Sequence, residues 1–204
     1  MERVDNYALQ AQQAKRYFLR YDQTELIAKL KLKSDENYLY VNLLCEPYRI
    51  RRDTGDMERC HKGLWMAANS HGEVMTILDL VCDSRPDRYI TGRWKNMQSF
   101  GRLFHSSLLE KERDPWAIRF DRDPESLHLA CRRLGGEALP GADICYSVEL
   151  FDGLCICIQF WHGDEEFAPR LRYLWDENAD RYLKYETMYF AVGLLHARMK
   201  EEME

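Results

Sequence analysis

The fold of this chain is decided by residues 144–160, which read ICYSVELFDGLCICIQF. Large apolar residues alternate with small or polar ones on both sides of Asp152-Gly153, a period of two that is typical of β-strands. The stretch therefore predicts a β-hairpin with one apolar face. A slip of one residue would turn one strand over, so Leu150 must pair with Leu154 if both apolar sets are to share a face. We therefore expect a three-residue loop, Phe151-Asp152-Gly153, with Gly153 in the left-handed conformation.

The same register predicts that Cys145, Cys155 and Cys157 lie together on the second face of the hairpin. Three thiols on one face could hold a soft metal or an iron–sulfur cluster. They could also pack as small apolar side chains, because free cysteine is among the most buried residue types. We favour packing, since Cys82 and Cys131 already lie in apolar helical stripes.

Segments around the hairpin predict several helices. Asp5 is placed to cap a helix over residues 5–20, and Thr24 is placed to cap a shorter second helix. Asp123 is placed to cap a further helix, which Gly135-Gly136 ends. Between them, apolar residues recur at helical spacing over residues 74–82. A long helix is expected from Asp180 to Lys200, and Tyr38–Leu44 predicts a strand followed by a turn at Glu46-Pro47. Residues 53–72 and 95–120 show no dominant period.

This order of elements predicts a single domain of residues 1–204 in the α+β class. We expect a mostly antiparallel sheet that includes the hairpin, packed with several helices and ending in the long C-terminal helix.

Composition narrows the function classes. The formal net charge of −5 argues against binding to nucleic acid, which normally needs a basic surface. No apolar stretch approaches the length of a membrane helix, and the polar N-terminus does not resemble a signal peptide. Seven cysteines without a disulfide-type spacing favour a cytoplasmic protein.

The strongest candidate site is an acidic run after the hairpin, WHGDEEF at 161–167. Trp161 could supply an apolar wall, while the carboxylates, with His162 as a ligand or proton shuttle, could hold a divalent cation or a cationic group. The alternative is an acidic loop whose carboxylates cap backbone amides. The candidate ligand-binding residues are Trp161, His162, Asp164, Glu165, Glu166 and Asp176, and the metal candidates are Asp164, Glu166, Asp79 and Asp83.

Asp79 and Asp83 are one helical turn apart, so their like charges need compensation. We favour Arg85 or Arg88 as the partner over a bound cation. The histidines His61, His71, His105 and His128 show no metal-ligand spacing, and there is no dinucleotide fingerprint, P-loop or nucleophile elbow.

The chain resembles a bacterial and archaeal family known as domain of unknown function 3786. The resemblance is carried by W-x-G-D-E-E-F-x-P at 161–169, L-W-D at 174–176, Leu134-Gly135-Gly136, and the segments 75–79 and 91–94. It implies no reaction, because the family has no established activity. Some relatives resemble this domain fused to cysteine-rich iron–sulfur segments, but this chain has no four-cysteine run, so an iron–sulfur cluster is not expected.

Three functions remain open at this point. The leading hypothesis is an accessory protein that binds a small ligand or a protein partner near the acidic run. The second is a metal-dependent enzyme using Asp164, Glu165 and Glu166, and the weakest is a redox or iron–sulfur partner using the hairpin cysteines.

Overall fold

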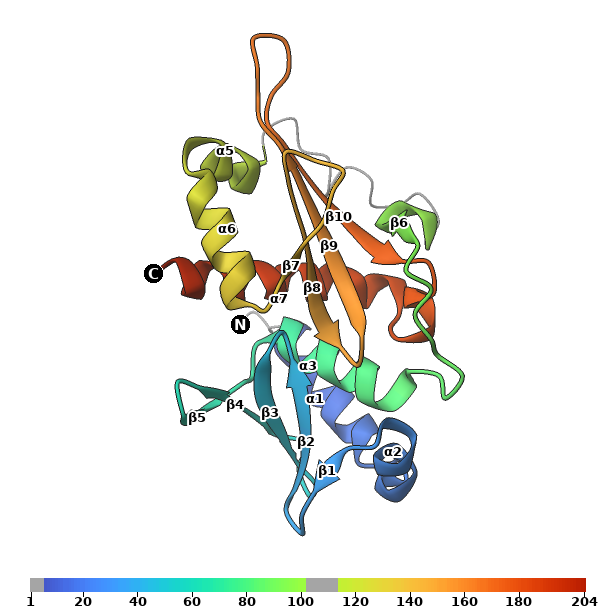
Figure 1. Cartoon of the computed structure of the whole chain (residues 1–204). Coiled ribbons are helices and arrows are strands. Elements are labelled where there is room, and N and C mark those ends of the chain that lie inside the picture. Colours follow the sequence, from blue (N-terminus) through green and yellow to red (C-terminus); the bar gives the residue numbers. More distant parts are fainter. Residues whose placement is uncertain (1–5, 102–113) are drawn as a thin grey trace. The chain divides into compact units, whose positions relative to one another are not determined.

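A computed structural model describes residues 6–101 and 114–204 (Figure 1). These divide into two compact units: unit 1 extends to Arg88 and includes residues 181–194, and unit 2 contains residues 89–180 and 195–204. Each unit has its own five-stranded antiparallel sheet, which confirms the α+β class. The single domain that we expect over residues 1–204 stays a prediction, because two compact units can still fold cooperatively.

Unit 1 contains a meander of five consecutive strands, each paired with its neighbours in sequence order. Alternate residues of β2 and β3, such as Leu39 and Ile50, are buried on one face of the sheet. Tyr48 on the same face donates a hydrogen bond to Glu73 of α3, so α3 lies against this face. The elements are α1 (Asn6–Phe18), α2 (Gln23–Leu30), β1 (Lys33–Ser34), β2 (Tyr38–Leu43), β3 (Glu46–Arg51), β4 (Met57–His61), β5 (Leu64–Ala67), α3 (His71–Leu78) and η1 (Asp79–Asp83).

Unit 2 contains the hairpin, and its sheet has the strand order β6-β10-β9-β8-β7. Ring contacts of Phe120 with Phe160, and of Tyr173 with His196, place α5 (Pro115–Arg122) and the end of α7 (Tyr185–Met203) on the apolar face of this sheet. The elements are β6 (Trp94–Asn96), η2 (Met97–Ser99), α5 (Pro115–Arg122), α6 (Pro124–Arg133), β7 (Glu137–Ala138), β8 (Ile144–Phe151), β9 (Leu154–Trp161) and β10 (Arg170–Asp176).

The C-terminal helix α7 (Tyr185–Met203) follows the short helix η3 (Ala179–Arg181). This confirms a long final helix, although it begins about one turn later than expected. Its residues up to Leu194 belong to unit 1, and those from Leu195 belong to unit 2. None of the helices in the described part of the chain is long and apolar enough to cross a membrane.

The hairpin that decides the fold forms with the predicted alignment of its apolar faces. Three apolar pairs face each other across β8 and β9, namely Ile144 with Phe160, Tyr146 with Ile158 and Val148 with Ile156.

The predicted three-residue loop is wrong. Phe151 pairs with Leu154, and a two-residue turn at Asp152-Gly153 joins the strands. Both turn residues have positive φ, 49° and 81°, as the tightest hairpin turns require. A register shift between Glu149 and Phe151 supplies the one-residue offset that we assigned to the loop.

Two further expectations in unit 1 are wrong. Asp22, rather than Thr24, caps α2, because its carboxylate accepts from the N–H groups of Thr24 and Glu25. The turn after β2 lies at Leu44-Cys45, where both residues have positive φ, and Glu46-Pro47 begins β3. The predicted cap Asp5 and the histidine His105 lie outside the described residues.

Candidate functional site

The acidic run forms a loop between β9 and β10 that projects beyond the sheet of unit 2 (Figure 1). Asp164 closes this loop: its Oδ1 accepts hydrogen bonds from the N–H groups of Glu166 at 2.8 Å and Phe167 at 2.7 Å. Gly163 allows the chain to return, because a Cβ at this position would lie 2.8 Å from Cδ of Pro169. Asp164 therefore organises its own backbone, as the capping interpretation predicts.

His162 faces α5 rather than the acidic side chains. Its Nδ1 lies 2.9 Å from Oδ1 of Asp121, and that oxygen also accepts from the N–H of Gly163. The hydrogen bond from His162 holds the pKa of the Asp121 carboxyl below its usual range. Asp121 was not predicted as a site residue from the sequence, because no local pattern relates it to the acidic run. Trp161 lies in a different direction, with the guanidinium of Arg172 5.5 Å from its ring centre.

Asp176 is only 2% exposed and lies at the end of β10. Its Oδ2 accepts from the N–H groups of Thr91 and Gly92 at 2.9 and 2.8 Å and from the Thr91 hydroxyl at 3.0 Å. Its Oδ1 accepts from the N–H of Asn178 at 2.9 Å. This carboxylate joins two segments that carry the family resemblance, 91–94 and 174–176. Its hydrogen-bonding capacity is largely occupied by this structural role.

The candidate ligand-binding residues of the acidic run thus contact different partners in the structure. Glu165 and Glu166 are exposed on the loop. They border an open hollow of about 540 Å³, which Asp121 and residues 163–169 line. A cation or ligand bound in this hollow stays a prediction.

Asp79 and Asp83 occupy a more enclosed setting in unit 1. They are the first and last residues of η1, a π-helical turn that continues α3, and such turns often occur at functional sites. The side chain of Asp79 is 5% exposed, and its Oδ1 lies 3.0 Å from Nζ of Lys184. Lys184 also donates a hydrogen bond to Asp83, and so does the hydroxyl of Tyr21.

The prediction that Arg85 or Arg88 compensates the charges of Asp79 and Asp83 is therefore wrong. Arg85 forms its ion pair with Asp87 instead, with Nε and Oδ1 3.0 Å apart. Lys184 takes the expected role because the fold brings the residues before α7 back to η1, and its own N–H donates to Oδ2 of Asp79 at 2.7 Å. In the sequence, the like charges of Asp79 and Asp83 indicated that a cation must lie near them. The spacing of residues could not identify Lys184 as that cation, because it comes from a distant segment.

This carboxylate pair forms one end of a cavity of about 370 Å³, which we call the unit-1 pocket. One stripe of α1, extended to Tyr21, faces one stripe of α3 and η1, each with residues at helical spacing. Aromatic and apolar side chains form much of the wall. The lining residues are Gln10, Gln13, Ala14, Tyr17, Phe18 and Tyr21, then Met75, Leu78, Asp79, Cys82 and Asp83, and finally Lys184 and Thr187.

The polar end of the unit-1 pocket is strongly ionic. Burial by itself raises the pKa of Asp83, but hydrogen bonds from Lys184 and Tyr21 outweigh it, so the net pKa is lower than usual. The same bond to Asp83 raises the pKa of Tyr21 to about 12. Burial lowers the pKa of Lys184, and the two carboxylates more than reverse this, so the pKa ends above its ordinary value. Lys184 therefore stays a cation and has no free amine for nucleophilic chemistry.

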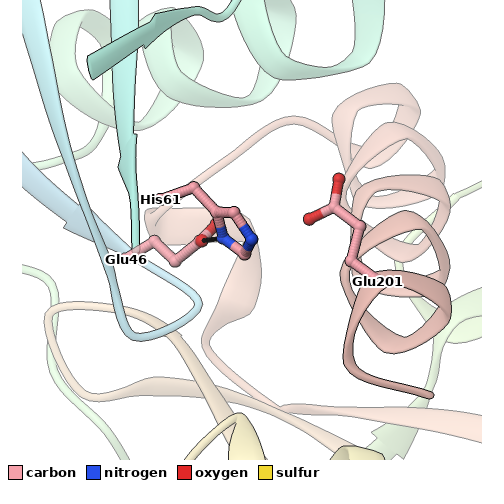
Figure 2. A group of neighbouring side chains, drawn as sticks. All are labelled: Glu46, His61 and Glu201. Atoms are coloured by element: carbon pink, nitrogen blue, oxygen red, sulfur yellow. Dashed lines mark hydrogen bonds and ion pairs between the residues drawn. The ribbon is translucent and has the colours of Figure 1, made fainter. Parts of the chain in front are cut away.

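A second polar group in unit 1 lies on β3 and β4. His61 Nδ1 lies 2.8 Å from Oε1 of Glu46, and Oε2 of Glu46 accepts from Arg59 at 2.8 Å. Figure 2 shows the two side chains meeting from neighbouring strands; Glu201, also drawn there, belongs to unit 2. Within either single unit, the described residues bring no three His, Cys, Asp or Glu ligand atoms within 4.8 Å of one another. The metal-dependent enzyme therefore stays a prediction.

The hairpin cysteines share a face, as predicted. The sulfur atoms of Cys145 and Cys157 are 3.7 Å apart and both residues are buried. Burial raises the pKa of the Cys157 thiol, and it raises that of Cys131 to about 12. Because the thiolate is the reactive and metal-binding form, protonated buried thiols fit a packing role better than a redox role.

These features define an α+β protein with two antiparallel sheets and, in unit 1, a cavity with an ionic end. The chain belongs to the family described as Domain of unknown function (DUF3786), whose model matches residues 22–198. No curated protein and no solved structure matches this chain.

Proposed function

We propose that this protein binds a small molecule in the unit-1 pocket. The observation that carries the proposal is the combination of a half-open cavity of about 370 Å³ with an aromatic wall and one ionic end. Small-molecule sites are typically concave, mostly apolar and equipped with a few polar groups that orient the ligand. Asp79 and Asp83 would supply that orientation.

The proposal keeps the accessory, ligand-binding role that we predict from the sequence but assigns it to a different place. The acidic loop offers an open hollow in which Asp164 is occupied by its own backbone. The unit-1 pocket is less open than this hollow, and Tyr17, Phe18 and Leu78 belong to its wall. Desolvation strengthens each polar contact with a ligand, which favours the less open site.

A pocket-filling substitution tests the proposal. Ala14 lies on the wall of the pocket, so Ala14→Phe should fill part of the cavity and abolish binding of small aromatic fragments. Ala28→Phe, on the exposed side of α2, is the matched control and should leave binding unchanged. A fragment screen by NMR, with amide shifts of residues 75–83 as the readout, measures both variants. If fragments bind wild type and Ala14→Phe with equal affinity, or if none perturbs residues 75–83, the proposal fails.

A further inference from the structure

We infer that the ligand of the unit-1 pocket carries a primary ammonium group, which binds between Asp79 and Asp83 in place of the Lys184 ammonium. This inference rests on the proposed function, because it concerns the same pocket. It specifies the chemical class of the ligand, an alkylamine or arylalkylamine with an apolar body.

The first support is the state of the Asp79 carboxylate. Its Oδ2 accepts the N–H of Lys184, and its buried Oδ1 lies 3.0 Å from the Lys184 ammonium. This ammonium is the countercharge of a carboxylate whose side chain is 5% exposed. A buried carboxylate without a countercharge is costly, so a ligand group that takes the place of Lys184 must itself be a cationic N–H donor.

The second support is that this end of the helix already attracts ammonium groups. Lys29 donates from Nζ to the carbonyl oxygens of Cys82 at 2.9 Å and Ser84 at 3.0 Å. Lys184 binds the carboxylates on the same turn. The carbonyl end of a helix carries partial negative charge, which favours cations. Two lysines from separate segments therefore bind at the carbonyl end of η1, and of these Lys184 lines the pocket.

The third support is that the side chain of Lys184 can move away from the two carboxylates. Its side chain is 62% exposed, in contrast to 5% for Asp79. Its backbone N–H would still hold Asp79 after the side chain had turned into solvent. A ligand ammonium would then meet two carboxylates in a pocket that Tyr17 and Tyr21 also line.

The charged side chains that line the pocket also favour a cation over an anion. Asp79 and Asp83 contribute two negative charges to the pocket wall and Lys184 one positive charge. A carboxylate or phosphate would therefore meet net repulsion, whereas an ammonium that replaces Lys184 preserves the balance.

The test uses three probes of similar shape: 2-phenylethylamine, 2-phenylethanol and 3-phenylpropionate. We expect the amine to bind wild type most tightly. Lys184→Met removes the competing ammonium and should tighten amine binding at least about tenfold, without tightening alcohol binding. Asp83→Asn should weaken amine binding by about tenfold and leave the alcohol unaffected. Lys200→Met, an exposed lysine of unit 2, is the control and should change neither.

Two readouts keep the outcomes distinct. Lys184→Met is expected to lower the melting temperature, and millimolar amine should raise it more in this variant than in wild type. If all three probes bind equally and Ala14→Phe abolishes that binding, the pocket stands and the ammonium inference is overturned. If Asp83→Asn leaves amine binding unchanged, the ammonium inference is likewise overturned. If no probe or fragment binds wild type, the proposed function itself fails.

Discussion

The acidic loop of unit 2 and the Asp79–Asp83 turn of unit 1 are both rich in carboxylates. They differ in what surrounds them. The loop is exposed, and Asp164 bonds to amides two and three residues further along the chain. The turn is partly buried, and its cation comes from Lys184, which lies 105 and 101 residues after the two aspartates in the sequence.

The difference shows that a run of carboxylates does not by itself indicate how strongly the fold constrains those side chains. Adjacent acids in an exposed loop are solvated and can satisfy one another's backbone, which costs little and requires no ligand. A buried carboxylate must be matched by a charge or donor that the tertiary structure brings to it. The less conspicuous pair in the sequence is therefore the more strongly constrained pair in the fold.

The sharpest test of this contrast is Lys184→Met. It leaves the buried Asp79 without its countercharge, so the free energy of unfolding should fall by about 3 kcal/mol. Urea denaturation at pH 7 measures the loss, and Lys200→Met should remain within about 0.5 kcal/mol of wild type. A Lys184→Met protein as stable as wild type would show that the ion pair at η1 is as dispensable as a surface pair.

A smaller effect is expected in the loop. Asp164→Ala removes the acceptor for two backbone amides and should cost roughly 0.5–2 kcal/mol, as for the loss of a helix cap. Glu166→Ala removes an exposed side chain and should cost less than about 0.5 kcal/mol. Hydrogen exchange at the Glu166 and Phe167 amides should accelerate in Asp164→Ala. Equal effects of the two substitutions would contradict the assignment of Asp164 as the organiser of the loop.

The smallest expected effect is a dependence on pH. The folded-state pKa of Asp83 is depressed, so the stability it contributes is present above the ordinary aspartate pKa of about 3.9 and is lost as the pH falls through the folded value. Asp83→Asn should therefore cost less than about 1 kcal/mol at pH 7, since the pair with Lys184 is partly exposed to screening solvent. The difference from wild type should shrink below pH 3.9. A difference that grows on acidification would reverse the assigned sign.

Local patterns predicted much of the secondary structure. The helix that Asp123 caps, the final helix and the aligned faces of β8 and β9 follow from periodicity and capping, which depend on neighbours in sequence. The prediction of the hairpin loop was wrong because two loop geometries place the apolar residues of β8 and β9 on the same face. A three-residue loop and a two-residue turn with a bulge both move the register by one residue, and the apolar pattern reports only the result.

The site was harder to predict for a different reason. Asp79 and Asp83 were recognised as metal candidates, and their like charges correctly indicated a partner. The sequence could not show that Lys184 and Tyr21 are that partner, because neither lies within a helical turn of the pair. Asp176 illustrates the same limit, since the donors at Thr91 and Gly92 are 85 and 84 residues away.

The amino-acid sequence by itself determined the α+β class, the hairpin with its apolar face, and the presence of acidic groups in two places, because each depends on short-range periodicity and side-chain chemistry. Only the tertiary structure decided which acids are buried and what neutralises them. Burial and countercharge depend on segments that meet across the fold. For that reason the enclosed pair beside Lys184, rather than the conspicuous loop, became the proposed binding site.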